Sequence, residues 1–308
     1  MSERIRVALV GMGKIAHTQH LPVIGQSSRF ELVATVDPVA DPADVAHFTD
    51  LTLLLKAGVA FEAAILCQPP QVRFQAARLA LQSDKHVLLE KPPATSVAEV
   101  AQLADLARHS GRSLFAAWHS RYAAGVPLAK EWLKDRRILG VRVEWREDVR
   151  YWHPGQRWIW ESGGLGVFDP GINALSILTQ LFEEPLAVAK GTLEYPGNRE
   201  MPIGAELELR SASGVPVHIV LDWRHTGTQT WRLDFDTDAG RMTLSEGGAR
   251  VQRPGHPEVS GRDQEYEHLY QRFAALIASG HSDADSEPLR LVTEAFLRCR
   301  KRTVEPFD

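Results

Sequence analysis

The sequence contains only two cysteines, Cys67 and Cys299, among its 308 residues. Two thiols cannot build a disulfide framework or a cysteine-rich zinc site. No run of about 20 consecutive apolar residues occurs, so no membrane-spanning helix is expected. The opening MSERIRVALVG has no long apolar stretch after a basic region, which argues against a secretory signal peptide. These absences predict a cytoplasmic protein with reduced thiols and without a membrane partner.

An excess of positive charge is also absent. Lysine and arginine number 35 against 39 aspartates and glutamates, a formal net charge of -4. Nucleic acid is not an expected partner, because non-specific binding needs a basic face that releases counterions. The chain is 44% hydrophobic and 24% charged, an ordinary globular composition. Its length exceeds that at which one hydrophobic core usually stops growing, so we predict two domains.

Short apolar runs alternate with helical patterns over the first 120 residues. The runs are rich in valine, leucine and isoleucine, which suits strands buried on both faces of a parallel sheet. Helical patterns separate them, most clearly at 71–82 and at 96–109, where Ser96 is a plausible helix cap. The repeated order of strand, helix and strand predicts a doubly wound α/β domain over residues 1–120. Its predicted strands are 5–10, 31–36, 63–67, 86–90 and 113–118.

The pattern changes in the second part of the chain. Several stretches alternate apolar and polar residues with period two, which is typical of antiparallel strands with one covered face. Charged helical patterns follow at 264–279 and 288–302. We therefore predict a second domain of α+β type over residues 121–308, whose C-terminal helix could pack back on the first domain. The predicted strands are 205–210, 215–223 and 231–238.

A glycine-rich turn follows the first predicted strand. Gly11, Gly13 and Ala16 stand in the spacing G-x-G-x-x-A. The first glycine permits a tight turn, the second lets a pyrophosphate approach the backbone, and the small third residue lets helix and strand pack closely. A purely structural glycine turn is the alternative. Asp37 favours a dinucleotide, because it ends the second strand where an acidic residue is expected.

Asp37 also bears on which dinucleotide binds. Its carboxylate can accept hydrogen bonds from the adenosine ribose hydroxyls but would repel a 2′-phosphate. Pro38 follows it, and not an arginine that could offset this repulsion. NAD is therefore the favoured cofactor, although loops elsewhere could admit NADP. No metal is expected, because His17 and His20 could imitate a metal pair but no third ligand is evident.

The stretch DKHVLLEKPPA at 84–94 carries a family resemblance. Its sequence Glu90-Lys91-Pro92, behind G-x-G-x-x-A, resembles the glucose-fructose oxidoreductase and inositol dehydrogenase (Gfo/Idh/MocA) family. The resemblance covers nearly the whole chain, including a G-G-x-x-x-x-D-x-x-x-H-like segment and the sheet-rich second domain. Within that family, HSRYA (119–123), EDVRYWHPGQRWIWE (147–161) and GGLGVFDPGIN (163–173) are similar to bacterial L-arabinose/D-galactose 1-dehydrogenases.

The resemblance implies a fold, an activity and an assembly. The fold is an N-terminal Rossmann domain followed by an α+β domain with an open, largely antiparallel sheet, which commonly serves as a subunit interface. The activity is oxidation of a cyclic aldose, L-arabinose or D-galactose, at C1 to the aldonolactone with NAD(P). The likeness to other members leaves open a dehydrogenase of another polyol, such as an inositol or a dihydrodiol, or a non-catalytic dinucleotide-binding sensor. A homodimer formed through the open sheet is expected.

Three positions depart from the common family pattern. The stretch between Asp37 and HFTD at 47–50 is short, so the second crossover helix is expected to be reduced to a loop. Arg73 stands where many members carry histidine. Asn173 stands where many members have the catalytic histidine, which leaves the identity of the general base open.

The candidate catalytic residues are Lys91, Asp169 and Asn173. Lys91 follows a strand at the edge where open α/β sheets bind ligands, and its ammonium could stabilise negative charge on the sugar O1. Asp169 could accept the O1 proton as the partner of Lys91, or it could be only a helix cap before Pro170. The sequence leaves open whether Asp169 or a neutral Lys91 takes the proton.

The candidate sugar-binding residues surround a tryptophan-rich stretch. Four of the eight tryptophans fall at 145, 152, 158 and 160, and aromatic faces suit the C–H side of a sugar ring. The alternative is that these rings cover a sheet edge. The predicted sugar contacts are Glu147, His153, His119, Trp152 and Trp231. The predicted dinucleotide contacts are Gly11, Gly13, Lys14, Ile15, Ala16, Asp37, Cys67, Pro69, Pro70, Glu90 and Lys91.

Overall fold

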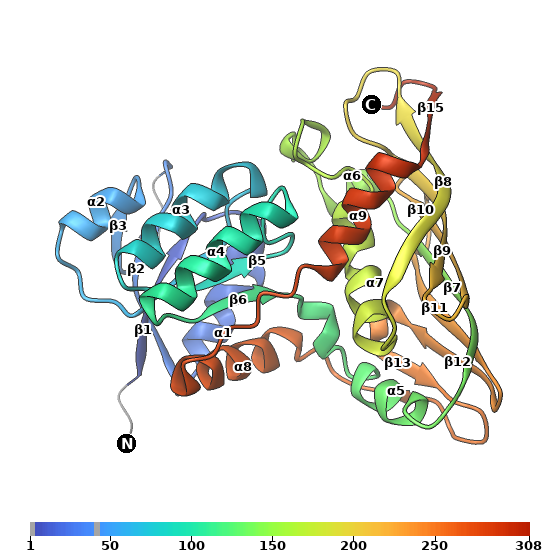
Figure 1. Ribbon diagram of the computed structural model, residues 1–308. Coiled ribbons are helices and arrows are strands. Elements are labelled where there is room, and N and C mark those ends of the chain that lie inside the picture. Colours follow the sequence, from blue (N-terminus) through green and yellow to red (C-terminus); the bar gives the residue numbers. More distant parts are fainter. Residues whose placement is uncertain (1–3, 40–43) are drawn as a thin grey trace. The chain divides into compact units, whose positions relative to one another are not determined.

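The computed structural model describes residues 4–39 and 44–308, and Figure 1 shows the course of the chain. The chain divides into two compact units. Unit 1 contains the chain up to Ala117 together with Tyr266–Ser286. Unit 2 contains Trp118–Glu265 and Glu287–Asp308.

Unit 1 is built on a parallel sheet, which confirms the predicted Rossmann fold. In the described residues its strand order is β3-β2-β1-β4-β5-β6, and each neighbouring pair is parallel. The order reverses between β1 and β4, and ligands bind at such a switch point in open α/β sheets. The strands are β1 (Ile5–Val10), β2 (Phe30–Val36), β3 (Ala46–Phe48), β4 (Ala63–Leu66), β5 (His86–Glu90) and β6 (Leu114–Ala117).

The predicted apolar runs form the core of this sheet. β4 is buried at all its positions, and β1 is buried from Val7 to Val10, as expected for strands covered on both faces. Ser96 caps α4 as predicted, because its hydroxyl accepts a hydrogen bond from the Glu99 N–H at 3.2 Å. The helices of the Rossmann chain are η1 (Ala16–His20), α1 (Leu21–Gln26), α2 (Leu51–Lys56), α3 (Pro70–Gln82) and α4 (Val97–Ser110).

One further helix of unit 1 comes from the far end of the chain. α8 (Glu265–Ser279) brings Phe273 to within 6.1 Å of both Phe30 and Phe115, measured between ring centroids. Tyr270 meets Phe30 edge-on at 5.1 Å. Aromatic pairs at such distances contribute beyond the area they bury. This packing attaches α8, coloured orange-red in Figure 1, to the Rossmann sheet.

The link between β2 and β3 is the place where a reduced crossover helix is expected. Residues 40–43 of this link lie outside the described residues. Residues 37–39 and 44–45, on either side, contain no helix. α2 follows only after β3 and is capped by Asp50, whose carboxylate accepts from the Leu53 N–H at 3.0 Å.

Unit 2 is built on a larger mixed sheet, and its largely antiparallel pairing confirms the predicted second fold. In the described residues the order is β14-β13-β12-β11-β7-β10-β9-β8-β15. β7 with β10 and β8 with β15 pair in parallel, whereas the other neighbours are antiparallel. The strands are β7 (Ile138–Arg146), β8 (Leu186–Pro196), β9 (Gly204–Ser211), β10 (Pro216–Asp222), β11 (Thr230–Thr237), β12 (Gly240–Ser245), β13 (Arg250–Gln252), β14 (Val259–Ser260) and β15 (Arg300–Val304).

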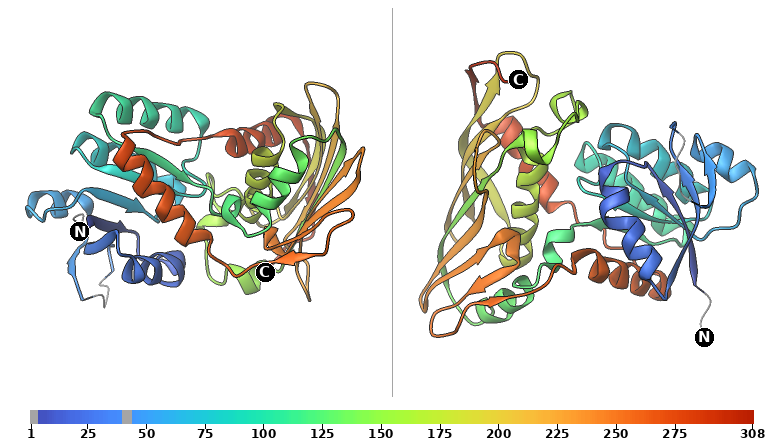
Figure 2. Two further views of the ribbon diagram at one scale, coloured as in Figure 1. Left: turned by 90° about the horizontal axis from the view of Figure 1, so that it is seen from below. Right: turned by 180° about the vertical axis from the view of Figure 1, so that it is seen from behind.

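Helices cover one face of this sheet. α5 (Val126–Leu133), α7 (Phe168–Leu181) and α9 (Glu287–Arg298) contact its strands from the same side, as Figure 2 shows. β10 accordingly alternates, with Val217, Ile219 and Leu221 buried. The predicted period of two is therefore confirmed in β10, whereas in β11 three consecutive residues, Leu233 to Phe235, are buried. From Val141 to Trp145, β7 alternates in the same way as β10 but was not among the predicted strands.

Two glycines of the first turn differ in what surrounds them. Gly11 has φ +91°, and a Cβ added there would lie 2.6 Å from the Gln68 backbone nitrogen. A Cβ added at Gly13 would have nothing within 4 Å. Only Gly11 is therefore required by the fold of unit 1 itself.

This difference predicts unequal effects of two matched substitutions on stability. Gly11→Ala should lower the free energy of unfolding by at least about 2 kcal/mol, because it combines backbone strain with a clash. Gly13→Ala should change it by no more than about 0.5 kcal/mol, as at an open surface site. Urea unfolding followed by circular dichroism measures both. Equal losses in the two variants would contradict this assignment.

Candidate active site

The predicted dinucleotide residues of unit 1 meet at the carboxyl edge of the parallel sheet. The Gly11 N–H donates to the Val36 carbonyl at 2.8 Å, and the Cys67 N–H donates to the Val10 carbonyl at 2.7 Å. These bonds place the ends of β2 and β4 beside the glycine turn. Lys14, Ile15 and the buried Ala16 lie where the helix begins, Pro69 and Pro70 open α3, and Glu90 and Lys91 follow at the end of β5.

Asp37 is held against the glycine turn. Its Oδ2 accepts from the Met12 N–H at 2.8 Å and its Oδ1 accepts from the Val39 N–H at 2.9 Å. A carboxylate offers about four lone-pair positions, so each oxygen can accept a further donor. The open space at Gly13 leaves room for a ligand beside this carboxylate. The arrangement fits a dinucleotide, with its ribose at Asp37 and its phosphates at Gly13.

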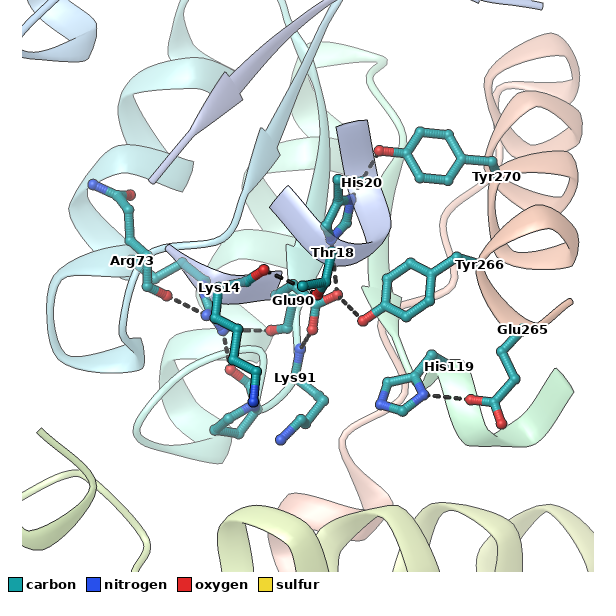
Figure 3. A network of polar contacts seen from close by, with 12 residues as sticks. Lys14, Thr18, His20, Arg73, Glu90, Lys91, His119, Glu265, Tyr266 and Tyr270 are labelled. Atoms are coloured by element: carbon teal, nitrogen blue, oxygen red, sulfur yellow. Dashed lines mark hydrogen bonds and ion pairs between the residues drawn. The ribbon is translucent and has the colours of Figure 1, made fainter. Parts of the chain in front are cut away.

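A buried polar network surrounds Glu90, which ends β5 (Figure 3). The Oε1 atom accepts from the Tyr266 hydroxyl at 2.7 Å and lies 3.0 Å from His20 Nε2. The Oε2 atom accepts from the Lys91 backbone N–H at 2.9 Å. The other nitrogen of His20, Nδ1, lies 2.8 Å from the Tyr270 hydroxyl. His20 is 0% exposed and Glu90 2% exposed, so these contacts lie in the interior of unit 1.

Burial and charge act in opposite directions on His20. Burial lowers the pKa of its imidazole, but contacts with Cys67, Tyr270 and Glu90 outweigh burial and hold that pKa well above its ordinary value. Burial also raises the pKa of Tyr270 to about 12. These contacts therefore favour the protonated form of the buried His20 imidazole beside Glu90. Sequence reasoning expected only polar or capping contacts at His20, because Tyr266 and Tyr270 lie far along the chain.

Arg73 fixes the backbone on either side of Lys91. Its guanidinium donates to the carbonyl oxygens of Gln68, Glu90 and Pro92, and the residue is 2% exposed. The peptide bond between Lys91 and Pro92 is cis. The arginine noted as a departure from the family pattern thus joins the ends of β4 and β5.

Glu147 lies at the centre of a second cluster, which belongs to unit 2. It follows β7 and is 3% exposed. Its Oε1 accepts from the Trp223 indole N–H at 3.2 Å, and its Oε2 accepts from the Trp231 indole N–H at 2.8 Å. Its backbone N–H donates to the Asp222 carbonyl at 3.0 Å, which continues the pairing of β7 with β10. Two neutral indole N–H donors therefore fix the orientation of the Glu147 carboxylate.

His153 lies between two carboxylates. Its Nε2 is 3.7 Å from Glu147 Oε1 and its Nδ1 is 3.8 Å from Asp169 Oδ2. Its side chain is 16% exposed, against 3% for both carboxylates, so the imidazole is the most accessible of the three groups. The structure thus brings together three of the predicted residues.

Asp169 is not the cap of its helix, so the capping alternative is wrong. α7 begins at Phe168 with Val167 at the cap position, and Asp169 lies in the first turn. The helix starts early because Leu165 and Gly166, both with positive φ, complete a turn just before it. Asn173 lies one turn later and is half-buried, on the same face as Asp169.

A close approach of α7 to the sheet supports this placement. A Cβ added at Gly171 would lie 2.5 Å from the Leu221 side chain of β10. Glycine at that position lets the first turn of α7 come down onto the strand that ends near Glu147. The carboxylate of Asp169 is buried as a result.

Aromatic rings line this cluster. Trp231 stacks on Trp145 at 5.6 Å and meets Trp152 at 5.0 Å, both measured between ring centroids. The Trp223 ring lies 5.2 Å from His153 and 5.2 Å from Trp160. Sequence reasoning missed Trp223, although it directly follows the alternating strand β10 and that position was a signal.

His119 has a different setting in η2 (His119–Tyr122). Its Nδ1 lies 2.5 Å from the Glu265 carboxylate and 3.3 Å from the Ser120 hydroxyl. Its role in sugar binding stays a prediction.

The cluster in unit 2 has the chemistry of a site for a polyhydroxy compound. Buried carboxylates accept hydrogen bonds from hydroxyl groups, an imidazole can donate or accept, and indole faces pack against C–H groups. Over residues 4–39 and 44–308, no group of three or more histidine, cysteine, aspartate or glutamate side chains could hold a metal ion. In the same residues, none of the helices has the length and apolar character needed to cross a membrane.

The chain is similar in sequence to known oxidoreductases. Residues 5–117 match the oxidoreductase family with an NAD-binding Rossmann fold (Gfo/Idh/MocA). Over 303 residues, 98% of this chain and 98% of the relative, the sequence is 38% identical to galactose 1-dehydrogenase of Pseudomonas fluorescens.

The chain is also similar to proteins of known structure. The crystal structure of a D-galactose-1-dehydrogenase protein from Rhizobium etli is 48% identical and has a TM-score of 0.94 over 100% of this chain and 99% of that chain. A 3-ketoreductase from Actinomadura kijaniata, in complex with TDP-benzene and NADP, has a TM-score of 0.85 over 98% of this chain and 100% of that chain. At 18% identity, the second likeness concerns the fold alone.

The raised pKa of His20 predicts how stability depends on pH. The stabilisation from a group whose pKa is raised on folding is complete below the unfolded value of about 6.5 and is lost as pH rises through the folded value. The unfolding free energy of wild type should therefore exceed that of His20→Gln most at pH 6. The excess should shrink above pH 6.5, by up to about 1.4 kcal/mol per pH unit.

Urea unfolding between pH 6 and pH 9 measures this difference. His17→Gln is the matched control, because His17 is an exposed histidine on the same helix. A difference between wild type and His20→Gln that stays constant with pH would show that His20 does not change its protonation on folding.

Proposed function

Since the chain belongs to the Gfo/Idh/MocA family of oxidoreductases, we propose that it oxidises a cyclic aldose, D-galactose or L-arabinose, at C1 to the aldonolactone. The observation that carries this proposal is the cluster of Glu147, His153 and Asp169 in unit 2, lined by indole rings. The similarity to galactose 1-dehydrogenase along nearly the whole chain supports it.

Glu147 and His153 are the proposed sugar-binding groups. Each Glu147 oxygen already accepts one indole N–H, which aims the carboxylate and leaves lone pairs for sugar hydroxyls. The faces of Trp152 and Trp231 suit the C–H side of the ring. L-Arabinopyranose lacks only the hydroxymethyl group of D-galactopyranose, so both present the same ring hydroxyls. One apolar contact at that substituent decides preference by only about 1–3 kcal/mol.

Asp169 is the proposed acceptor of the O1 proton. Asn173 cannot take this role, because an amide does not titrate near neutral pH. Asn173 instead donates and accepts hydrogen bonds that orient the sugar. The ammonium of Lys91 stabilises negative charge as it develops on O1. A neutral Lys91 as the base is the alternative that a substitution at Asp169 tests.

The carboxyl edge of unit 1 is the proposed cofactor site. NAD bound there supplies the hydride acceptor. Asp37 accepts from the ribose hydroxyls and its charge opposes a 2′-phosphate, so NAD is favoured over NADP. Gly13 leaves the backbone accessible to the pyrophosphate, and Lys14 and Ile15 begin the helix that faces it.

We also propose a homodimer formed through the uncovered face of the sheet in unit 2. That face carries charged side chains in complementary pairs. Lys190 lies 3.1 Å from Glu208, and His218 lies 3.0 Å from Glu206. A sheet face that carries charged pairs of this kind can pack against the same face of a second copy about a twofold axis. Each charged pair then occurs twice in the interface.

The proposed activity predicts the outcome of a substrate panel. Free aldoses and inositols, each with NAD or NADP, are followed by the absorbance of the reduced nicotinamide. D-Galactose and L-arabinose should be oxidised, with the higher kcat/KM for NAD. Asp37→Ser combined with Pro38→Arg should move the preference toward NADP, because a repulsive charge is removed and a cation is gained.

Three outcomes of this panel would count against the proposal. Oxidation of an inositol but of no aldose would make the protein a polyol dehydrogenase, and reduction with neither class would favour a sensor. A wild-type preference for NADP of tenfold, about 1.4 kcal/mol, would contradict the assigned role of Asp37.

Two substitutions on α7 should separate proton transfer from orientation. Asp169→Asn should lower kcat by about 10²–10⁴-fold, the usual effect of removing a general base. The fold should persist, because no helix cap is lost at this position. Asn173→Ala should raise KM for the sugar more than it lowers kcat. Steady-state kinetics across pH measure both effects. A near wild-type kcat in Asp169→Asn would mean that Lys91, and not Asp169, accepts the O1 proton.

A further inference from the structure

The Glu90 carboxylate gathers donors from three separate parts of unit 1. His20 comes from η1, Tyr266 comes from α8, and the third donor is the backbone N–H of Lys91 itself. Figure 3 shows these groups converging on one buried side chain. The carboxylate therefore joins the helix behind the glycine turn and the helix from the far end of the chain to the peptide of Lys91.

Only a carboxylate can serve all of these donors. Each of its two oxygens accepts freely, whereas an amide of the same shape has a single accepting oxygen and adds two donors of its own. With at least three donors converging, a glutamine at position 90 would leave one of them facing an N–H group. At 2% exposure, solvent has little room to replace the missing acceptor.

The charge of this carboxylate is balanced inside the network. Burying an ion is costly unless an opposite charge and hydrogen bonds accompany it. The raised pKa of His20 is consistent with an imidazolium in that role. Titratable groups in contact with the pair include Tyr266 and Tyr270 of α8 and Cys67, which directly follows β4.

The Lys91 backbone is held from both directions. Glu90 Oε2 accepts its N–H, and Arg73 binds the carbonyl oxygens of the residue before it and of the residue after it. The backbone from which the flexible Lys91 side chain extends is therefore fixed in position. In Figure 3 the Lys91 ammonium points away from the Glu90 network. Catalysis depends on such placement, since a misplacement of about 1 Å can cost 10²-fold in rate.

We propose that Glu90 is a positioning residue for Lys91, and that its contacts with His20 and Tyr266 exist to hold the Lys91 peptide in place as well as to attach α8. This inference rests on the proposed function, in which Lys91 acts on the sugar O1. A purely structural role is the competing explanation, since the same contacts would also hold α8 on the sheet.

A double-mutant cycle separates the two explanations. Glu90→Gln and Lys91→Ala are made singly and together in the full chain. If Glu90 acts through Lys91, Glu90→Gln should lower kcat by roughly 10- to 100-fold in wild type. In the Lys91→Ala background the same change should alter kcat by no more than about twofold, because the group that it positions is gone. An equal loss in both backgrounds would overturn the proposal.

Two measurements that do not depend on turnover accompany the cycle. Hydrogen exchange of the peptide spanning 86–96 should be faster in Glu90→Gln, since the Lys91 N–H loses its acceptor. Affinity for NADH, from fluorescence titration, is measured in the same variants, because Glu90 is also a predicted dinucleotide contact, and it should fall by less than kcat does. Unchanged exchange would contradict the proposal, as would a loss of NADH affinity that accounts for the whole kinetic effect.

Two conservative tyrosine variants cover the case in which Glu90→Gln does not fold. Tyr266→Phe removes one donor to Glu90 and should lower kcat in wild type but not in Lys91→Ala. Tyr270→Phe is the matched control on the same helix, because its hydroxyl contacts Nδ1 of His20 and not the Nε2 that faces Glu90. It should lower the melting temperature without lowering kcat. Equal kinetic losses in the two tyrosine variants would overturn the proposal.

Failure of the proposed function gives a different result. A wild-type protein that oxidises no aldose refutes the activity, and the role of Glu90 falls with it. An active wild type with additive effects of Glu90→Gln and Lys91→Ala refutes the positioning role alone.

Discussion

Glu90 is a carboxylate at 2% exposure, and an ion buried to that extent needs donors and a counter-charge around it. In unit 1 the donors arrive from η1, from α8 and from the Lys91 peptide. Because α8 lies far along the chain from the Rossmann strands, the network is complete only when that helix has returned to the sheet. The attachment of α8 and the geometry at Lys91 thus share one interaction.

Glu147 meets the same requirement in unit 2 by other means. Its donors are two neutral indole N–H groups, and His153 lies 3.7 Å from its Oε1. Neutral donors orient a carboxylate without cancelling its charge. The proposed binding of sugar hydroxyl groups by Glu147 uses that charge, whereas Glu90 is paired with His20 inside the protein. Two buried carboxylates in one chain are suited to different tasks by the partners that bury them.

The position at which α7 begins determines the setting of Asp169, the proposed proton acceptor. Leu165 and Gly166 complete a turn that lets the helix begin at Phe168, which places Asp169 in the first turn and not at the cap. Asn173 stands one turn further, where an amide can orient a ligand but cannot exchange a proton.

Local features of the sequence determined much of this protein. The strands of the parallel sheet other than β3, the Ser96 cap, the glycine turn and Asp37 at the end of β2 were all predictable, because hydrophobic period and short motifs depend on neighbouring residues. Only the tertiary structure decided the partners of the buried carboxylates. His20, Tyr266 and Trp223 contact Glu90 or Glu147 from 70, 176 and 76 residues away, and no local pattern encodes a contact at such separations. Membership of α8 in unit 1 was decided in the same way, by aromatic side chains that meet only after the chain has folded.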